Sequence, residues 1–358
     1  MPKISILTPC FNHEKYILQF LESVKNQTFK DFELIIINDC STDNTANLIK
    51  NFNDDRIKLI NQEFNQGLNS ALNIGFENSS SDILVYIASD DILNNNALEL
   101  IVKAFEENPD KNVVYSAVSA IDETGKSLNS IIKPKLKNRF EILRKIFYSS
   151  NPLISPGMAI KKSAFEKIYP LQPAIVNLQD VLMHINLLLE NEILVTDNIL
   201  INYRIPCEKS GISVRSTATE NRENLEVYSI LNEFLKIKDV DLLYKIFGED
   251  VKKYGQPTVE TIPYFLAQFA LNSDKQTRKV WGYHTLVNFL ASQENFDLIN
   301  KLYGFDYKQL LNLVKAFDET EEMKLNKKVK KYKNLFNITL LISSFVVLFM
   351  IILMFIVK

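Results

Sequence analysis

Carboxylates gather directly after short apolar runs in the first half of the chain. One polar cluster follows Pro9, a second includes Asp39, and a third is the adjacent pair Asp90 and Asp91. Two neighbouring carboxylates at the end of a buried strand repel each other, so they need a cation or strong hydrogen bonds. A small set of carboxylate oxygens suits Mg²⁺ or Mn²⁺ that is shared with substrate phosphates. The Asp90–Asp91 pair therefore predicts a divalent-metal site that handles phosphate groups.

Other ways of binding nucleotides or metals find little support in the sequence. The chain has nine glycines and neither a G-x-x-x-x-G-K-[S/T] nor a G-x-G-x-x-G motif, so a glycine-rich phosphate loop is not expected. Three cysteines without a C-x-x-C pair argue against a disulfide framework or a structural zinc site. A net charge of -2 over 358 residues gives no general basic field, so we expect no nucleic-acid partner.

Alternating apolar runs and amphipathic segments must position these polar clusters. The runs are rich in Ile, Val and Leu with little polar alternation, which is typical of strands buried on both faces. They occupy residues 4–9, 33–39, 56–61, 82–89 and 112–121, and helical patterns occupy 16–27, 42–52, 68–78 and 96–107. This order predicts an α/β fold with a mostly parallel sheet and helices on both sides. Ligands of such sheets bind beyond the carboxyl ends of the strands, where the polar clusters stand.

Five segments in order resemble family 2 glycosyltransferases, which are GT-A fold enzymes that use nucleotide-diphospho-sugars. The segments are TPCFNHEKYI, KNQTFKDFELIIINDCSTDNT, NQGLNSALNIG, YIASDDI and the pair Gln179-Asp180. Each match is short, but together they cover about residues 3–204 in the order of the family. The resemblance implies a Rossmann-like GT-A domain and an inverting transfer from a nucleotide sugar.

The first segments carry the expected nucleotide site. By the resemblance, Pro9 and Phe11 border the nucleobase and Asp39 hydrogen-bonds it. Asn12 and Glu14 shape the same loop. The base is expected to be uracil, so the expected donor is a UDP-sugar.

The third and fourth segments carry the expected diphosphate and metal contacts. Gly67 and Asn69 open the third helix and are expected near the nucleotide and its diphosphate. Asp90 and Asp91 correspond to the end of the DXD element of the family, in which one residue contacts the ribose and one the Mn²⁺ or Mg²⁺ ion. Ala88 stands where the common D-x-D-D form begins with Asp.

The expected chemistry needs a general base as well as a metal. Inverting transfer is a single displacement at the anomeric carbon, in which a base takes the acceptor proton and a cation stabilises the departing diphosphate. The resemblance assigns the base to Asp180, at the start of an amphipathic helix, where Gln179 replaces the usual Glu. His184 lies on the same helix face. It could orient the base or touch the metal or acceptor, but a packed helix histidine is the favoured interpretation.

The second half of the chain is expected to be helical and to end in a membrane. A GT-A domain over 1–216 is followed by a helical domain over 217–320, through which a homo-oligomer could form. A basic juxtamembrane segment over 321–334 precedes residues 335–357, which carry no charge. The uncharged segment is long enough to cross a bilayer as one C-terminal transmembrane helix. The preceding lysines then place the catalytic domain in the cytoplasm, on a single-pass protein of the inner (cytoplasmic) membrane.

A membrane-held sugar transferase is expected to act on a membrane-bound glycan. The expected acceptor is a lipid-linked oligosaccharide, a lipopolysaccharide or a capsule precursor. Two alternatives stay open. Because Ala88, Gln179 and Leu72 depart from the family pattern, the chain could be a catalytically weak scaffold of a glycan assembly complex. It could also be a nucleotidyltransferase that uses a similar sheet and metal.

Overall fold

The computed structural model describes residues 1–205, 216–317, 325 and 328–340. The chain forms two compact units, Met1–Ile299 and Asn300–Lys358. The first unit holds the α/β part and most of the helical part. The domain boundaries expected from the sequence stay predictions.

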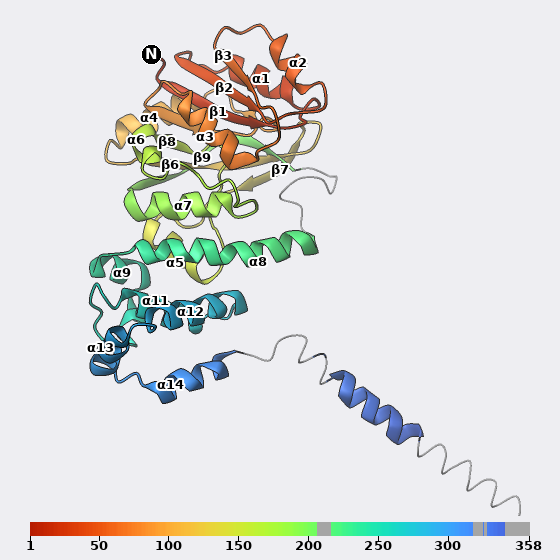
Figure 1. The fold of residues 1–358 in the computed structure, drawn as a ribbon. Helices are drawn as coiled ribbons and strands as arrows, with labels where there is room; N and C mark the ends of the chain where they lie inside the picture. Colours follow the sequence, from red (N-terminus) through yellow and green to blue (C-terminus); the bar gives the residue numbers. More distant parts are fainter. Residues whose placement is uncertain (206–215, 318–324, 326–327, 341–358) are drawn as a thin grey trace, which may run out of the picture. The chain divides into compact units, whose positions relative to one another are not determined.

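The described residues of the first unit form one sheet of nine strands, in the order β3-β2-β1-β4-β8-β6-β9-β5, with β7 pairing with β6 (Figure 1). The strands are β1 Ile4–Cys10, β2 Phe32–Asn38, β3 Ile57–Asn61, β4 Ile83–Tyr86, β5 Ile92–Leu93, β6 Val113–Ile121, β7 Ser127–Ile132, β8 Ala159–Lys161 and β9 Ile193–Arg204. The half from β3 to β4 is parallel, as predicted. The other half is mixed, because β8 runs antiparallel between β4 and β6.

Strand direction brings the polar clusters to one edge of the sheet. Strands β1, β2 and β4 are parallel to one another. The antiparallel β8 restores the same direction in β6, which pairs with β9 in parallel. The carboxyl ends of these strands, and the loops that follow them, therefore lie along a single edge.

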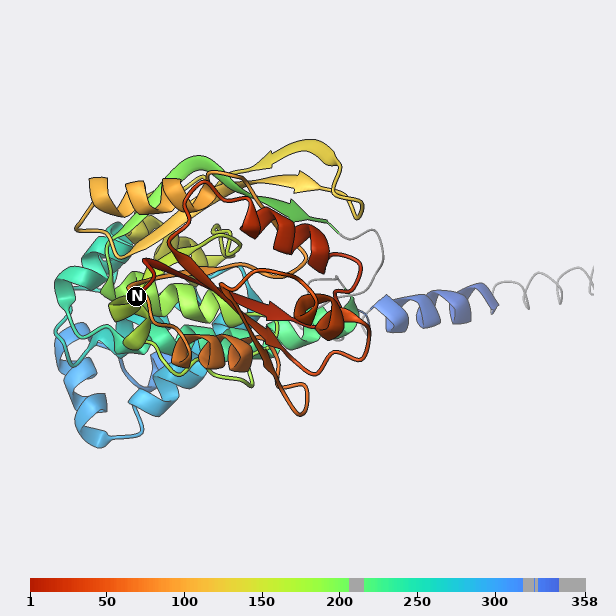
Figure 2. The same ribbon diagram turned by 90° about the horizontal axis from the view of Figure 1, so that it is seen from above.

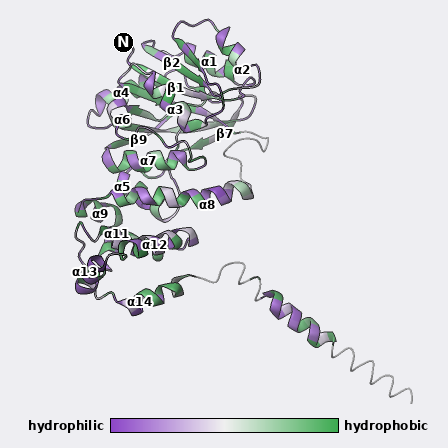
Figure 3. Cartoon of the chain, in the orientation of Figure 1, coloured by the Kyte–Doolittle hydropathy of each residue, from purple (hydrophilic) through white to green (hydrophobic). Residues whose placement is uncertain are grey.

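Helices cover both faces of the sheet, and its central strands β1, β2 and β4 are mostly hydrophobic (Figures 2 and 3). The helices of this part are α1 Ile17–Lys25, α2 Thr45–Lys50, α3 Leu68–Glu77, α4 Ala97–Glu107, α5 Arg139–Tyr148, α6 Lys162–Glu166 and α7 Gln179–Glu190. Helix α1 buries Ile17, Phe20, Leu21 and Val24, whose spacing places them on one face. Helices α1 and α4 pack on one side of the sheet, and α3 packs on the other, where a Cβ on Gly75 would meet Ile37.

A helical region follows the sheet and shares a core with α5. Its elements are α8 Thr217–Asn232, η1 Glu233–Lys236, α9 Val240–Phe247, α10 Glu249–Lys252, α11 Ile262–Leu271, α12 Gln276–Phe289 and α13 Gln293–Tyr303. The ring of Phe147 in α5 meets the rings of Phe234, Phe247 and Trp281 at centroid distances of 5.0, 4.9 and 6.0 Å. These aromatic residues therefore form a core. Oligomerisation through this region stays a prediction.

The prediction of a C-terminal membrane helix is wrong for the described residues. The second unit contains α14 Tyr307–Asn312, η2 Leu313–Ala316 and a helix over 328–340. Within the parts of the chain that the structure describes, no helix has the length and apolar character needed to cross a membrane. The finding overturns the predicted transmembrane helix over 335–357 and the single-pass inner-membrane localisation. Residues 341–357 of that span lie outside the described residues.

Candidate active site

The loops after β1 and β2 are locked together by side chains from the first loop. Asn12 accepts a hydrogen bond from the Thr42 N–H at 2.8 Å, and Glu14 accepts one from the Asn44 N–H at 2.9 Å. Asn12 itself has a left-handed backbone, with φ of 55°. Both side chains thus shape the loops of the expected nucleotide site. Phe11 stands 42% exposed beside them, where an aromatic ring is open to a ligand.

Asp39 orders the turn that starts α3. Its two carboxylate oxygens accept hydrogen bonds from the N–H groups of Gln66 (2.7 Å) and Gly67 (2.8 Å), and the residue is 5% exposed. Gly67 has φ of 83°, a conformation that L side chains rarely adopt. The structure therefore brings Asp39 and Gly67 into contact, while their expected roles toward the nucleotide stay predictions. It also gives Asp39 a structural partner that the sequence did not predict. Pro9 lies inside β1, opposite Ile37.

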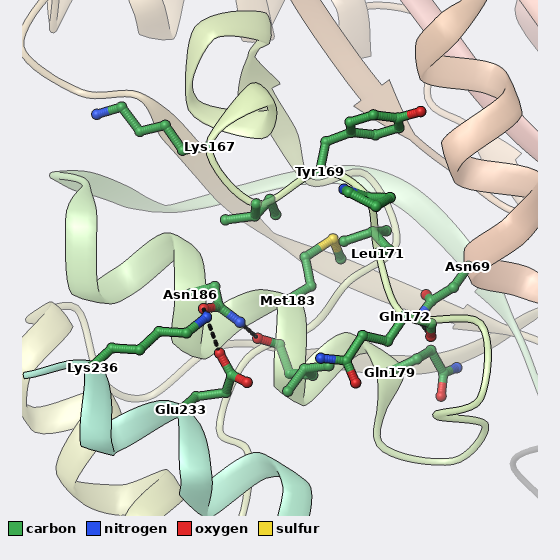
Figure 4. Close-up of a pocket in the computed structure, with 13 residues that line it drawn as sticks. Asn69, Lys167, Tyr169, Leu171, Gln172, Gln179, Met183, Asn186, Glu233 and Lys236 are labelled. Atoms are coloured by element: carbon green, nitrogen blue, oxygen red, sulfur yellow. Dashed lines mark hydrogen bonds and ion pairs between the residues drawn. The ribbon is translucent and has the colours of Figure 1, made fainter.

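Asn69 holds a later loop rather than pointing into open space. Its amide donates to the main-chain oxygen of Gln172 at 2.7 Å, and Asn73 makes a reciprocal pair with Leu171. Asn69, Leu171 and Gln172 line one side of a cavity of about 220 Å³ (Figure 4). Its lining comprises Asn69, Lys167, Ile168, Tyr169, Pro170, Leu171, Gln172, Gln179, Leu182, Met183, Asn186, Glu233 and Lys236. Of the predicted site residues, this lining contains Asn69 alone, so the cavity lies beside the predicted site.

The Asp90–Asp91 turn is held by the last residue of β9. Asp91 is 1% exposed and accepts a hydrogen bond from the Arg204 N–H at 2.8 Å. The buried Arg204 guanidinium donates to the main-chain oxygens of Asp90 (2.6 Å), Asp122 and Glu123. Arg204 is thus a structural clamp on the turn, a role that sequence reasoning missed, because the two segments lie more than 100 residues apart.

Burial and the neighbouring Asp90 charge raise the pKa of Asp91 well above its usual range. A divalent cation would offset this concentration of negative charge, so the pair fits a metal ion. Within the described residues, no group of three or more His, Cys, Asp or Glu side chains is spaced to hold a metal. An ion at this turn would therefore need diphosphate oxygens from the substrate to complete its ligands.

Asp180 stands in the first turn of α7 and is held from two sides. Its Oδ1 accepts from the Val181 N–H at 2.8 Å, and its Oδ2 accepts from the Ser155 hydroxyl at 3.1 Å and from the Asn151 amide at 3.5 Å. His184, which is completely buried, places Nε2 3.3 Å from the same hydroxyl. Burial lowers the pKa of His184 to about 4, against the opposing effect of the Asp180 charge. The sequence did not single out Ser155, since it lies in a loop without periodicity.

The helical region reaches the start of α7 through one carboxylate. Glu226 of α8 accepts hydrogen bonds from three successive N–H groups, those of Val176, Asn177 and Leu178, at 2.8–2.9 Å. These are the residues directly before α7, so Glu226 fixes the approach to Asp180. An anion at this position also interacts favourably with the helix dipole. Sequence reasoning missed Glu226, because nothing in α8 distinguishes it from the acidic residues around it.

The charges of Asp90, Asp91 and Asp180 affect the pKa values of the same two tyrosines. Burial raises the pKa of Tyr86 at the end of β4, and the charges of Asp180, Asp91 and Asp90 raise it further. The pKa of Tyr203 in β9 is raised by burial and by the same three charges. The predicted metal ligands and the predicted base therefore all lie within electrostatic range of Tyr86 and Tyr203. A mixed α/β sheet with a paired-aspartate turn after β4 and an aspartate at the start of α7 has the layout of a GT-A fold.

Comparison with known proteins places the chain in a family of that type. Residues 5–169 match the model of glycosyl transferase family 2. An uncharacterized glycosyltransferase of Methanocaldococcus jannaschii is 30% identical over 217 residues, which cover 59% of this chain and 74% of that relative. The chain belongs to glycosyl transferase family 2 and is a glycosyltransferase.

Two further similarities bear on substrates. The GalNAc(5)-diNAcBac-PP-undecaprenol beta-1,3-glucosyltransferase of Campylobacter jejuni is 36% identical over 110 residues, covering 30% of this chain. The match spans only 36% of the Campylobacter enzyme. The crystal structure of S. aureus TarS 1–349 in complex with UDP-GlcNAc has the same fold, with a TM-score of 0.53, 19% identity and 83% coverage of each chain.

Proposed function

We propose that the protein transfers one sugar from a UDP-sugar to a lipid-linked glycan with inversion at the anomeric carbon. The observation that carries this proposal is the buried Asp90–Asp91 turn, held by Arg204, whose charges act together with that of Asp180 on Tyr86. A donor diphosphate beside the aspartate pair would leave its sugar facing the α7 end of the site. The UDP-GlcNAc complex of the similarly folded TarS supports a uridine nucleotide.

Asp180 has the geometry of a general base in this proposal. Its carboxylate receives hydrogen bonds from Val181 at Oδ1 and from Ser155 and Asn151 at Oδ2, which fix its orientation and leave a further lone pair on Oδ1 for an acceptor hydroxyl. The Asp90–Asp91 turn would hold a Mn²⁺ or Mg²⁺ ion together with the donor. When bound, this ion would neutralise charge on the leaving nucleoside diphosphate. Arg204 keeps the turn in place.

The name of the Campylobacter relative supports the acceptor class. That enzyme glucosylates an undecaprenyl-diphosphate-linked oligosaccharide, according to its name. We infer a related acceptor here. It is an oligosaccharide linked to undecaprenyl diphosphate, a lipopolysaccharide or a capsule precursor. This inference rests on the relative and on the family.

The proposal is tested by incubating the purified protein with UDP-glucose, UDP-galactose or UDP-N-acetylglucosamine. The reactions contain Mn²⁺ or Mg²⁺ and a synthetic undecaprenyl-diphosphate-linked oligosaccharide, and product mass and released UDP are measured. One added hexose or N-acetylhexosamine supports the proposal. Bound donor without transfer to any acceptor favours a catalytically weak scaffold. Pyrophosphate released from a nucleoside triphosphate identifies a nucleotidyltransferase instead.

A further inference from the structure

A chain of polar groups runs from the interior of the protein to Asp180. His184 lies one turn after Asp180 in α7 and is completely buried. Ser155 comes from the loop before β8, and its hydroxyl lies 3.3 Å from His184 Nε2 and 3.1 Å from Asp180 Oδ2. The hydroxyl therefore bridges the imidazole and the carboxylate.

The direction of the hydrogen bonds in this chain follows from the groups themselves. An ionised carboxylate accepts hydrogen bonds and donates none, so the single O–H of Ser155 is donated to Asp180. The Ser155 oxygen can then accept from His184, which requires the proton of the neutral ring to be on Nε2. His184 Nδ1 is buried and has no hydrogen-bond partner among the described residues. A proton on Nδ1 would be a buried donor without an acceptor. The buried side of the imidazole ring therefore also favours the Nε2–H tautomer.

The surroundings of His184 keep the ring neutral and fixed. Burial lowers its pKa to about 4, so the ring is uncharged at neutral pH. The Tyr115 ring packs edge-on against it, with centroids 5.2 Å apart and an interplanar angle of 85°. The imidazole is therefore a preorganised donor rather than a proton carrier.

We propose that His184 and Ser155 are positioning residues that aim the Asp180 carboxylate through a one-way chain, Nε2–H to Oγ and O–H to Oδ2. The inference rests on the proposed function, in which Asp180 is the base. Its consequence is that an interior side chain without substrate contact controls the turnover step. General-base catalysis depends on orientation, so a loosened carboxylate lowers kcat and leaves donor binding intact.

Kinetics of four variants test this proposal. In H184F a ring of similar shape lacks the donor, whereas H184Q places an amide donor near the position of Nε2, and S155A removes the bridge. We expect H184F and S155A to lower kcat about tenfold with the KM for the UDP-sugar within about twofold of wild type. H184Q should recover most of the loss. The double variant S155A/H184F should also lose only about tenfold, because both changes break one chain. A hundredfold loss in the double variant, or equal losses in H184F and H184Q, would overturn the proposal.

A spectroscopic measurement tests the same chain without turnover. The protein has three histidines, so ¹⁵N-histidine labelling gives a small spectrum in which H184Q identifies the His184 signals. Long-range ¹H–¹⁵N spectra at neutral pH should show the Nε2–H tautomer for His184. An Nδ1–H tautomer or a charged ring would overturn the proposal, even if H184F failed to fold.

The variant D180N separates this inference from the function on which it rests. If D180N transfers sugar at the wild-type rate, Asp180 is not the base and both proposals fail. If D180N is inactive while S155A and H184F keep wild-type kcat, the proposed function stands and the positioning chain fails.

Discussion

The buried imidazole of His184 makes a quantitative prediction about acid stability. Burial lowers the pKa of this ring from 6.5 to about 4. Between these two pH values the unfolded chain binds a proton at His184 that the folded chain does not. The free energy of unfolding therefore falls as the pH is lowered through this range. From pH 7 to pH 5 the loss amounts to about 2 kcal/mol, at 1.36 kcal/mol per pH unit between the two titrations.

Replacing the ring isolates its contribution. Carboxylates titrate in the same range, but they are common to the wild type and H184Q and cancel in the difference between the two proteins. Urea unfolding at several pH values should show that the wild type loses about 2 kcal/mol more than H184Q between pH 7 and pH 5.

A matched control variant is H284Q, since the side chain of His284 is exposed on α12. Its difference from wild type should vary by less than about 0.5 kcal/mol over the same range. A difference between wild type and H184Q that is constant with pH would refute the reasoning. It would mean that the folded state takes up a proton at His184 as readily as the unfolded chain does.

Three further substitutions test the site. D180N should reduce transfer about a thousandfold without weakening UDP binding measured by calorimetry, and activity within tenfold of wild type would contradict its role as base. E226Q replaces a carboxylate that accepts three N–H groups, so the free energy of unfolding should fall by about 2 kcal/mol. The exposed E223Q in the same helix is its control, and equal stability of the two would refute the capping role. G67A forces an L side chain to φ of 83° in open space, so urea unfolding should show a backbone cost of about 2 kcal/mol; an unchanged midpoint would contradict this conformation.

The predicted strands follow the observed ones closely where the sheet is parallel. The run over 4–9 corresponds to β1, and the run over 33–39 corresponds to β2, because Ile, Val and Leu in continuous runs mark strands buried on both faces. The run over 82–89 was too long, since β4 ends at Tyr86 and the chain turns toward Asp90. That turn depends on Arg204, a contact that local pattern does not reveal. The three-residue β8 is too short to show any period.

Some candidate site residues could be chosen from residue type alone, and others only by resemblance to the family. Asp90 and Asp91 were singled out from residue type, because two adjacent carboxylates after a buried strand repel each other and require a partner, whereas Asp180 was assigned by the resemblance. Asp39 and Asn69 were assigned to the nucleotide by resemblance, yet both bind main-chain groups of neighbouring loops.

The side chains of Asp39 and Asn69 hold neighbouring loops in place, and they are also the expected contacts of the donor. Substituting either residue changes the shape of the site as well as any direct contact with the donor. A loss of donor affinity in such a variant therefore does not by itself identify a ligand contact. By contrast, Asp180 is held by Ser155 and Asn151, which come from the loop before β8 and not from its own helix. A carboxylate whose orientation is set by side chains of another segment is the arrangement expected of a residue that acts on a substrate.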